Sequence, residues 1–420
     1  MGVIQSVFAR RHGQPTDMQG PPLTAWNDVF QPYATQAVAL RQHIHQRPEL
    51  GFQEHETAAL VAGKLRDWGY AVTEGVGGTG VVGVLKVGDG NRSLGIRADM
   101  DALPIQETTG LPYGSVHQGV MHACGHDGHT AMLLGAAHYL ADTRNFSGTL
   151  NLIFQPAEEG LAGARRMMDD GLFTRFPCDA IFGMHNIPGL PQGKLVFAAG
   201  PLLASNDRLT ITVRGKSAHG AEPQNGADAL VGAAAIVMAL QTVVSRNLDP
   251  QSSAVVTVAS LHAGKANNVI ADEAVLQVTI RTHDRHVRDT VLAAVHRVVR
   301  LQAESFGLTA DIVSGANPYP PLINSVAETR FAQAVAVDTF GDDRVATASR
   351  LLMNSEDFAF MLEARPGSYL LIGNGDGPGS CMVHHPGYDF NDANIEVGVA
   401  YWSRLAEQFL TDPSASCLTA

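Results

Sequence analysis

Apolar positions follow a helical spacing near the start of the chain. Between residues 36 and 70 they recur every three or four residues, with an interruption at residues 48–51, which include proline and glycine. This spacing is typical of amphipathic helices, and proline and glycine interrupt them. The segment therefore predicts two helices that open the first folded domain.

Short runs of β-branched and apolar residues follow these helices. They lie at residues 81–84, 94–98, 150–154 and 180–184, and a helical pattern covers residues 130–140. Strands that alternate with helices predict a layered α/β domain with a largely parallel sheet. Ligands of such sheets bind outside the carboxyl ends of the strands, where we expect the functional site. The polar clusters that follow three of the runs are residues 99–101, 155–160 and 185–186.

The pattern changes after Pro201. Strand-like runs lie at residues 209–213, 254–259 and 274–280, and helical patterns lie at residues 227–244 and 287–299. Their β-α-β-β-α order predicts a second, compact α+β domain. Helical patterns at residues 326–337 and 396–410 and a strand-like run at residues 369–372 then return to the first layer.

We expect two domains, because 420 residues exceed the size at which one hydrophobic core usually stops growing. The expected divisions are a disordered leader at residues 1–22, a metal-binding catalytic domain at residues 23–203 and 319–412, an inserted domain at residues 204–318, and a tail at residues 413–420.

Composition and charge exclude several classes of protein. Hydrophobic residues make up 45% of the chain and charged residues 17%, and we see no apolar run long enough to suggest a membrane span. The net charge of -12, without a basic cluster, argues against nucleic-acid binding. Four scattered cysteines favour a reducing compartment, and residues 3–9 are too short for the apolar part of a signal peptide. We therefore expect a soluble, cytoplasmic protein.

The strongest local signal is a cluster of metal-ligand side chains. His122, Cys124, His126 and His129 lie within eight residues, at the point where a loop meets a predicted helix. Thiolate and imidazole together favour zinc or a similar divalent ion. No second pair follows at zinc-finger spacing, so further ligands must come from distant loops. A buried cysteine among ordinary loop histidines is the alternative reading.

Adjacent carboxylates follow another predicted strand. Glu158 and Glu159 point in different directions, so one can bind metal while the other faces substrate. A carboxylate that takes a proton from a metal-activated water is what amide hydrolysis requires. Such a pair alone is usually a solvated turn, and only the neighbouring histidines and Asp101 strengthen the functional reading.

Other motifs are absent or misleading. Residues 75–80 match the glycine fingerprint of dinucleotide-binding folds, but they precede a predicted strand instead of opening a helix, so we interpret them as a turn. The chain has no serine-hydrolase elbow, no His-Glu-x-x-His helix and no phosphate-binding loop.

Ten segments together resemble the M20 metallopeptidase family, in its branch of aminoacylases, hippurate hydrolases and auxin-conjugate hydrolases. The resemblance covers nearly everything from residue 41 to the last predicted helix. The matching segments are HIHQRPELGFQEHET, RADMDALPIQE, HACGHDGHTAMLLGAA, NLIFQPAEEG, GMHN, VRGKSAHGAEP, NNVI, TIRT, NSEDFAF and HHPGYDFND.

The resemblance implies two divalent metal ions, zinc, manganese, cobalt or nickel, and a set of ligands for them. Glu158 would be the general base, and Asp101 would brace a ligand. His384 is preferred to His385 as the last ligand because it aligns with the end of the family motif. The implied ligands are Cys124, His126, Glu159, His185 and His384.

The resemblance also implies a role for the inserted domain, as a ferredoxin-like lid that makes a homodimer or a dimer-based oligomer. His219 would reach the partner's site and stabilise the oxyanion, with help from Asn267 or Asn268. Arg281 would bind the substrate carboxylate, since a guanidinium pairs with carboxylate in a bidentate manner.

The activity implied is hydrolysis of N-acyl amino acids of hippurate, N-acetyl or aryl-acyl type. Two alternatives remain: a dipeptidase or carboxypeptidase of the same superfamily, and a non-catalytic metal-binding interaction protein. Cys124, in place of the aspartate of many peptidase branches, favours acyl substrates. The presence of every implied ligand disfavours the non-catalytic alternative.

Overall fold

The computed structural model describes residues 25–377 and 379–411, which form two compact units. Among the described residues, the first unit comprises residues 25–200, 324–350 and 360–411, and the second comprises residues 201–323 and 351–359. The second unit therefore includes residues 351–359, which the sequence analysis placed in the catalytic domain. The expected leader and most of the expected tail lie outside the described residues.

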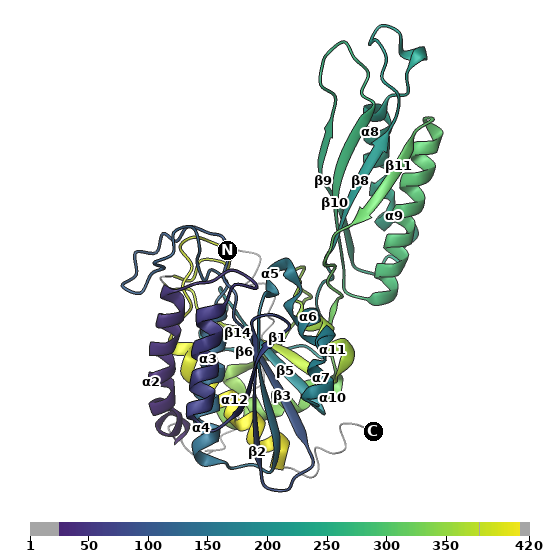
Figure 1. Ribbon diagram of the computed structural model, residues 1–420. Coiled ribbons are helices and arrows are strands. Elements are labelled where there is room, and N and C mark those ends of the chain that lie inside the picture. The colour runs from purple at the N-terminus through teal and green to yellow at the C-terminus, as the bar shows by residue number, and fades with distance from the viewer. Residues whose placement is uncertain (1–24, 378, 412–420) are drawn as a thin grey trace. The chain divides into compact units, whose positions relative to one another are not determined.

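The first unit is built on an eight-stranded sheet with helices on both faces (Figure 1). The strand order is β1-β2-β4-β3-β5-β14-β6-β13. The strands are β1 (Ala71–Val76), β2 (Gly80–Val87), β3 (Ser93–Asp99), β4 (Gly148–Gln155), β5 (Ala180–Ile187), β6 (Leu195–Phe197), β13 (Val345–Thr347) and β14 (Gly367–Gly373).

The centre of this sheet is parallel, whereas its flanks are mixed. The neighbours β4, β3, β5 and β14 run parallel to one another, but β1 with β2, β2 with β4, and β14 with β6 pair in antiparallel fashion. The expected parallel pairing therefore holds for the central strands and for β6 with β13, and the sheet as a whole is mixed. The antiparallel β1–β2 hairpin was missed because β1 is half exposed and lacks a continuous apolar run. The turn of this hairpin lies within the glycine-rich segment at residues 75–80, as expected.

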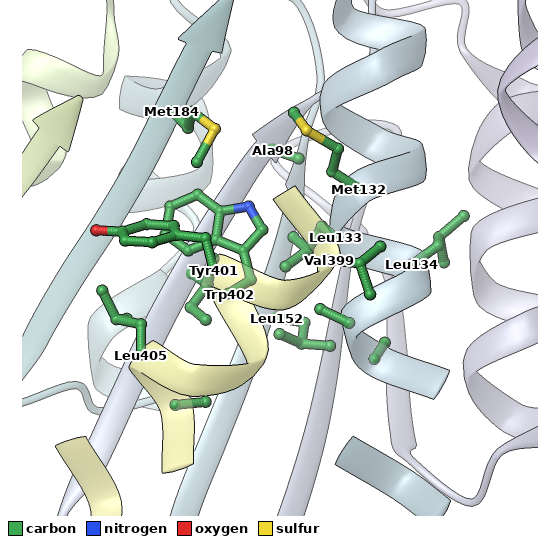
Figure 2. Packing of buried hydrophobic residues seen from close by; sticks show 14 of the residues in the cluster. Ala98, Met132, Leu133, Leu134, Leu152, Met184, Val399, Tyr401, Trp402 and Leu405 are labelled. Carbon is green, nitrogen blue, oxygen red and sulfur yellow. The ribbon is translucent and has the colours of Figure 1, made fainter. Parts of the chain in front are cut away.

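Helices bury their apolar faces against this sheet. In Figure 2, Trp402 and Tyr401 of α12 pack beside Met132 of α4 and Met184 of β5. The helix α4 is buried along most of its length, which explains its almost continuous apolar sequence. The helices of this layer and its surroundings are α2 (Ala25–Gln46), α3 (His55–Asp67), α4 (His126–Thr143), α5 (Glu158–Leu161), α6 (Gly163–Asp169), α7 (Leu172–Arg175), α10 (Val326–Phe340), α11 (Phe358–Ala364), α12 (Ala393–Thr411) and the 3-10 turn η2 (Asp342–Arg344).

The second unit is a four-stranded antiparallel sheet in the order β11-β8-β10-β9, against which two helices pack. Together with the β-α-β-β-α-β order this is a ferredoxin-like arrangement, and β11 is the strand that the sequence analysis missed. Its elements are β8 (Asp207–Arg214), α8 (Ala229–Asn247), β9 (Ala254–Ala263), β10 (Glu273–Thr282), α9 (Arg285–Ser305), β11 (Thr309–Ser314) and the 3-10 turn η1 (Pro223–Asn225); β7 (Gly200–Leu203) and β12 (Leu322–Asn324) form a separate two-stranded sheet.

The helix α8 is the one described helix that is long and apolar enough to cross a membrane, with a mean hydropathy of 1.7. The sequence analysis did not single it out. Its residues Ala233, Ile236 and Leu240 are fully buried in the core of the second unit. This buried face accounts for part of its apolar character.

The core of the first unit predicts a stability effect for Leu133→Ala. Leu133 is fully buried, so its truncation leaves a cavity and lowers the free energy of unfolding by about 2–5 kcal/mol. The three tryptophans, at positions 26, 68 and 402, belong to the first unit, so tryptophan fluorescence during urea unfolding reports on it. Val116→Ala is the control, because Val116 is 61% exposed and its truncation changes stability by less than about 0.5 kcal/mol. Equal effects of both substitutions would contradict this account of the core.

Candidate metal centre

The candidate site lies at the carboxyl ends of the central parallel strands. Asp99 ends β3, Gln155 ends β4, and His185 lies near the end of β5. These three strands are neighbours and run in the same direction. Their ends therefore meet at one edge of the sheet, as the sequence predicts.

The loop before α4 brings two candidate ligands to this edge. His126 is the first residue of α4, and Cys124 lies two positions earlier. Between them Gly125 has φ of +92°, and a Cβ there would lie 2.3 Å from the side-chain nitrogen of Asn186. Glycine is therefore required both for the backbone conformation and for the close approach of β5.

All five expected metal ligands take part in groups whose ligand atoms lie within 4.8 Å of one another. The Cys124 Sγ atom is 3.3 Å from Nε2 of His185, and Oε1 of Glu159 is 3.1 Å from Nε2 of His384. Three of these groups are Cys124 with His126 and His185, Cys124 with Glu159 and His384, and His126 with Glu158 and Glu159. Cys124, His126 and Glu159 each belong to two of the three, so the groups overlap in one cluster.

Hydrogen bonds at Nδ1 orient the imidazole rings of two expected ligands. Nδ1 of His126 lies 2.9 Å from the carbonyl oxygen and 3.1 Å from Oδ1 of Asp101, and Nδ1 of His185 lies 2.6 Å from the carbonyl oxygen of Asn186. Each Nδ1 therefore donates to these oxygens, which directs Nε2 towards the other candidate ligands. Nε2 of His126 and Oε1 of Glu159 are buried without a hydrogen bond, although Nε2 of His384 lies 3.1 Å from Oε1 of Glu159. These atoms are suited to bind a cation.

Asp101 links two of the expected ligands. Its Oδ1 accepts from Nδ1 of His126, and its Oδ2 accepts from the backbone N–H of Glu159 at 2.9 Å. One carboxylate thus fixes the orientation of an imidazole and the position of a glutamate. The bracing role expected of Asp101 agrees with these contacts.

A further group contains Asp99, His126 and His129. In His129, Nδ1 contacts Oδ1 of Asp99 at 2.7 Å, and Nε2 accepts from the backbone N–H of Asn186 at 3.0 Å. Both ring nitrogens of His129 are therefore engaged by the protein, so this residue does not offer a free ligand atom. His122 is buried and belongs to none of the groups among the described residues.

Acidic side chains surround the candidate ligands. Burial raises the pKa of the Cys124 thiol well above its ordinary value, and Glu159 and Glu158 raise it further. Burial alone would lower the pKa of His126, but Asp99 and Asp101 outweigh it and raise the pKa to about 10. Burial and the neighbouring His129 hold the pKa of His185 well below its usual range. Divalent cations would offset the excess of anionic groups and favour the thiolate, so the residues present fit a metal centre.

The last expected ligand, His384, lies on a separate loop and has a left-handed backbone conformation. His384 has φ of +69°, and its backbone N–H donates to the carbonyl of Ala123 at 2.7 Å. This conformation is unfavourable for a residue with a Cβ and requires support from its surroundings. His385 instead accepts the backbone N–H of Gly387 at Nδ1 and joins no metal-ligand group of the described chain. The geometry favours His384 over His385.

Comparison with known proteins identifies the family. Residues 95–408 match the Peptidase family M20/M25/M40. The chain belongs to the M20 peptidase family. It is 43% identical over 372 residues to a hippurate hydrolase of Campylobacter jejuni, with 88% of this chain and 96% of the relative covered. It is 40% identical over 364 residues to an N-acetyl-L-cysteine deacetylase of Bacillus subtilis, with 86% and 85% covered.

A solved structure from Bacillus subtilis supports the same assignment. It is a dinuclear metal-binding peptidase of the M20 family, with 34% sequence identity and a TM-score of 0.78. The match covers 90% of this chain and 99% of the solved chain. The two-domain M20 fold inferred from the sequence is therefore confirmed.

The sequence analysis assigned no role to two residues that support this M20 site. The side chain of Asn186 donates to the carbonyl of Cys124 at 2.7 Å and accepts from the Tyr388 hydroxyl at 2.5 Å. These bonds connect the loop of Cys124 with β5 and with the loop of His384. Asn186 follows His185 directly and Tyr388 lies four residues after His384, so proximity to a ligand was the available signal.

A buried ionic network lies behind the M20 ligands. Nε of the fully buried Arg41 contacts Oδ2 of Asp127 at 2.8 Å, and its guanidinium also pairs with Asp389. Asp127 follows the ligand His126, and Asp389 lies on the loop of His384. The network thus joins α2 to both ligand segments. Nδ1 of His45 contacts Oδ2 of Asp127 at 2.8 Å.

The four expected substrate-contacting residues lie in the second unit. His219 forms an isolated antiparallel β-bridge with Val269, and the backbone N–H of Gly220 donates to the carbonyl of Asn268. His219 therefore lies close to Asn267 and Asn268. Arg281 is the second-last residue of β10, whereas Asn267 and Asn268 precede the first residue of this strand, and burial lowers the pKa of Arg281. Its Nη1 atom is buried without a hydrogen-bond partner. Their roles towards substrate remain predictions.

The ionic network predicts a pH-dependent stability. Burial alone would lower the pKa of His45, but Asp127 outweighs it and raises the pKa from 6.5 to about 9. The stabilisation is therefore complete below pH 6.5 and is lost as the pH rises through about 9. We expect the unfolding free energy of the first unit to fall by up to about 3 kcal/mol over this range.

The His45→Asn variant should show a smaller decline when urea unfolding is followed by tryptophan fluorescence. His55→Asn is the control, because His55 is exposed. An unchanged pH dependence in His45→Asn would contradict the assignment.

Proposed function

We propose that this M20 enzyme hydrolyses the amide bond of N-acyl amino acids to a carboxylic acid and a free amino acid. The observation that carries the proposal is the assembly of one thiol, three imidazoles and one carboxylate with an additional carboxylate, Glu158, in one cluster of side chains. The names of the relatives, a hippurate hydrolase and an N-acetyl-L-cysteine deacetylase, support acyl substrates.

The five ligands would hold two divalent cations, with Cys124 shared between them. When bound, such cations polarise a carbonyl oxygen and increase the acidity of water. The donor set of one thiolate, three imidazoles and one carboxylate suits zinc, manganese, cobalt or nickel. A thiolate ligand must stay reduced, which fits the reducing, cytoplasmic location that we propose.

Glu158 would act as the general base and then as the acid. It is 7% exposed and lies in one group with His126 and Glu159. Because Glu159 is the expected ligand, Glu158 is left to take a proton from water and to deliver it to the leaving amine. Adjacent residues divide the two tasks, since their side chains leave the backbone in different directions.

Residues of the second unit would recognise the substrate. Arg281 would bind the α-carboxylate, because its half-buried guanidinium has an unpartnered Nη1 atom. His219 and Asn267 or Asn268 would stabilise the oxyanion. Since these residues and Arg281 lie at opposite ends of β10, we propose that His219 serves the site of a second copy of the chain.

A homodimer through the second unit fits its exposed surface. The strand β9 is an edge strand, so its outer backbone groups are open to pairing. The neighbouring helix α8 exposes Leu230, Val231 and Met238, the last to 70%. An edge strand beside exposed apolar side chains is typical of an interface.

The Glu158→Gln variant tests the mechanism. Glutamine keeps the size of the side chain but cannot take the proton, so kcat should fall by a factor of at least about 10²–10⁴. Metal content, measured by mass spectrometry, should stay at the wild-type level. The assay uses hippurate, N-acetyl amino acids, indole-acetyl amino acids and dipeptides with each metal. Near-normal turnover of Glu158→Gln would contradict the mechanism.

The same assay separates the substrate classes. Activity on dipeptides alone would favour the alternative of a dipeptidase or carboxypeptidase. Cys124 as the expected bridge favours acyl substrates instead, because many peptidase branches have an aspartate there. Failure of the wild-type enzyme on all four substrates, with metal bound, would contradict the substrate class.

The Met238→Glu variant tests the dimer. A charge placed in the apolar face of α8 should convert the dimer into a monomer in analytical ultracentrifugation, because burial of an unpaired carboxylate is unfavourable. Val313→Glu is the control: Val313 is 64% exposed on β11, the opposite edge of the same sheet, and this variant should remain dimeric. A wild-type monomer, or a dimer that survives Met238→Glu, would contradict the proposed interface.

A further inference from the structure

Glu54 is a buried carboxylate at the start of α3 that does not cap its own helix. It is fully buried, and its side chain makes no capping hydrogen bond to α3. Its Oε1 accepts the backbone N–H of Ala157 at 2.8 Å, and its Oε2 accepts the Thr79 hydroxyl at 2.5 Å. Both donors are neutral. The glutamate therefore serves through its two acceptor oxygens and through a side chain long enough to contact both donors.

The residue held by Glu54 has an unfavourable backbone. Ala157 has φ of +54°, in the left-handed region, and it directly precedes Glu158 and Glu159. A non-glycine residue persists there only when its surroundings determine the conformation. The bond from its N–H to Glu54 and the bond from Gly163 N–H to its carbonyl, 3.0 Å, fix the peptide groups on both sides.

The segment before Glu54 also packs closely on this residue. A Cβ on Gly51 would lie 3.1 Å from both Cα and Cβ of Ala157. The absence of a side chain at Gly51 thus allows the chain to pass over Ala157 and brings Glu54 within reach of its N–H. Two independent contacts, one of packing and one of hydrogen bonding, converge on one backbone position.

The turn between β1 and β2 completes the arrangement. Thr79 is 8% exposed and lies in the glycine-rich segment that resembles a dinucleotide fingerprint. Its hydroxyl holds the second oxygen of the Glu54 carboxylate, so the side chain cannot turn away from Ala157. This contact gives a role to a motif that the metal centre itself leaves unexplained.

We propose that Glu54, held by Thr79, is a positioning residue that fixes Glu158 and Glu159 in their separate directions through the backbone of Ala157. A rotation at Ala157 would turn both carboxylates, so that neither would keep its place. The inference rests on the proposed function for the role of Glu158, but the placement of Glu159 as a ligand is testable without any substrate.

The test compares Glu54→Ala, Glu54→Gln and Thr79→Val with Glu328→Ala in the full-length protein. Glu328 is equally buried but lies on α10, away from the metal centre, so it controls for the loss of a buried carboxylate. Four measurements are made: hydrogen exchange of a peptide covering residues 155–160 in the metal-free protein, zinc affinity by chelator competition, the melting temperature, and kcat with KM.

We expect Glu54→Ala to speed hydrogen exchange of this peptide and to lower zinc affinity and kcat by roughly 10–100-fold, with a smaller change in KM. Thr79→Val should change hydrogen exchange, zinc affinity and kcat in the same directions, but by smaller amounts. Glu54→Gln should stay close to wild type, because the amide oxygen still accepts from Ala157 and the amide nitrogen can donate to Thr79. Glu328→Ala should lower the melting temperature alone.

The proposal would be overturned if Glu54→Ala had the same hydrogen exchange and the same zinc affinity as Glu328→Ala. Equal losses in Glu54→Ala and Glu54→Gln would also overturn it, because charge and not hydrogen bonding would then matter. If the wild-type enzyme cleaves none of the substrates, the proposed function fails, whereas exchange and zinc affinity still decide the role of Glu54.

Discussion

The concentration of buried anionic groups at the carboxyl ends of the parallel strands is the constraint on which the rest of the first unit depends. The carboxylates of Asp99, Asp101, Glu158 and Glu159 lie close to the thiol of Cys124, and all of these residues except Glu159 are buried. Carboxylates taken out of water destabilise a fold unless cations or hydrogen-bond donors compensate for them. The protein supplies part of this compensation through histidine rings and backbone N–H groups, and divalent cations would supply the remainder.

Because the ligands come from separate loops, the fold must determine each loop independently. The backbone does so with unfavourable conformations at Ala157 and His384 and with a glycine at position 125. Hydrogen bonds then fix the side chains, as the bond between Asp101 and Nδ1 of His126 does. A site placed in this way needs little rearrangement when it binds a cation or a substrate, which is what catalysis by fixed groups requires.

The two units carry different parts of the proposed chemistry, and each has its own hydrophobic core. The first unit contains every expected metal ligand and the expected base. The second unit contains the residues expected to recognise substrate, at opposite ends of one strand. This separation allows the ligand geometry to be rigid while substrate recognition varies with the surface of the second unit.

The sequence by itself determined the two-domain α/β organisation, most helices and strands, and the candidate ligands, because apolar periodicity and the order of soft side chains are local properties. It missed β1 and β11, whose half-exposed residues lack a clear apolar pattern, and the three- or four-residue strands β6, β7, β12 and β13, which are too short to show one. It also assigned no role to Asn186, Tyr388 and Glu54. Only the tertiary structure decided these roles. Asn186 and Glu54 bind backbone atoms that are distant in the sequence, and Tyr388 binds the side chain of Asn186, so each role depends on how the chain folds over long sequence separations.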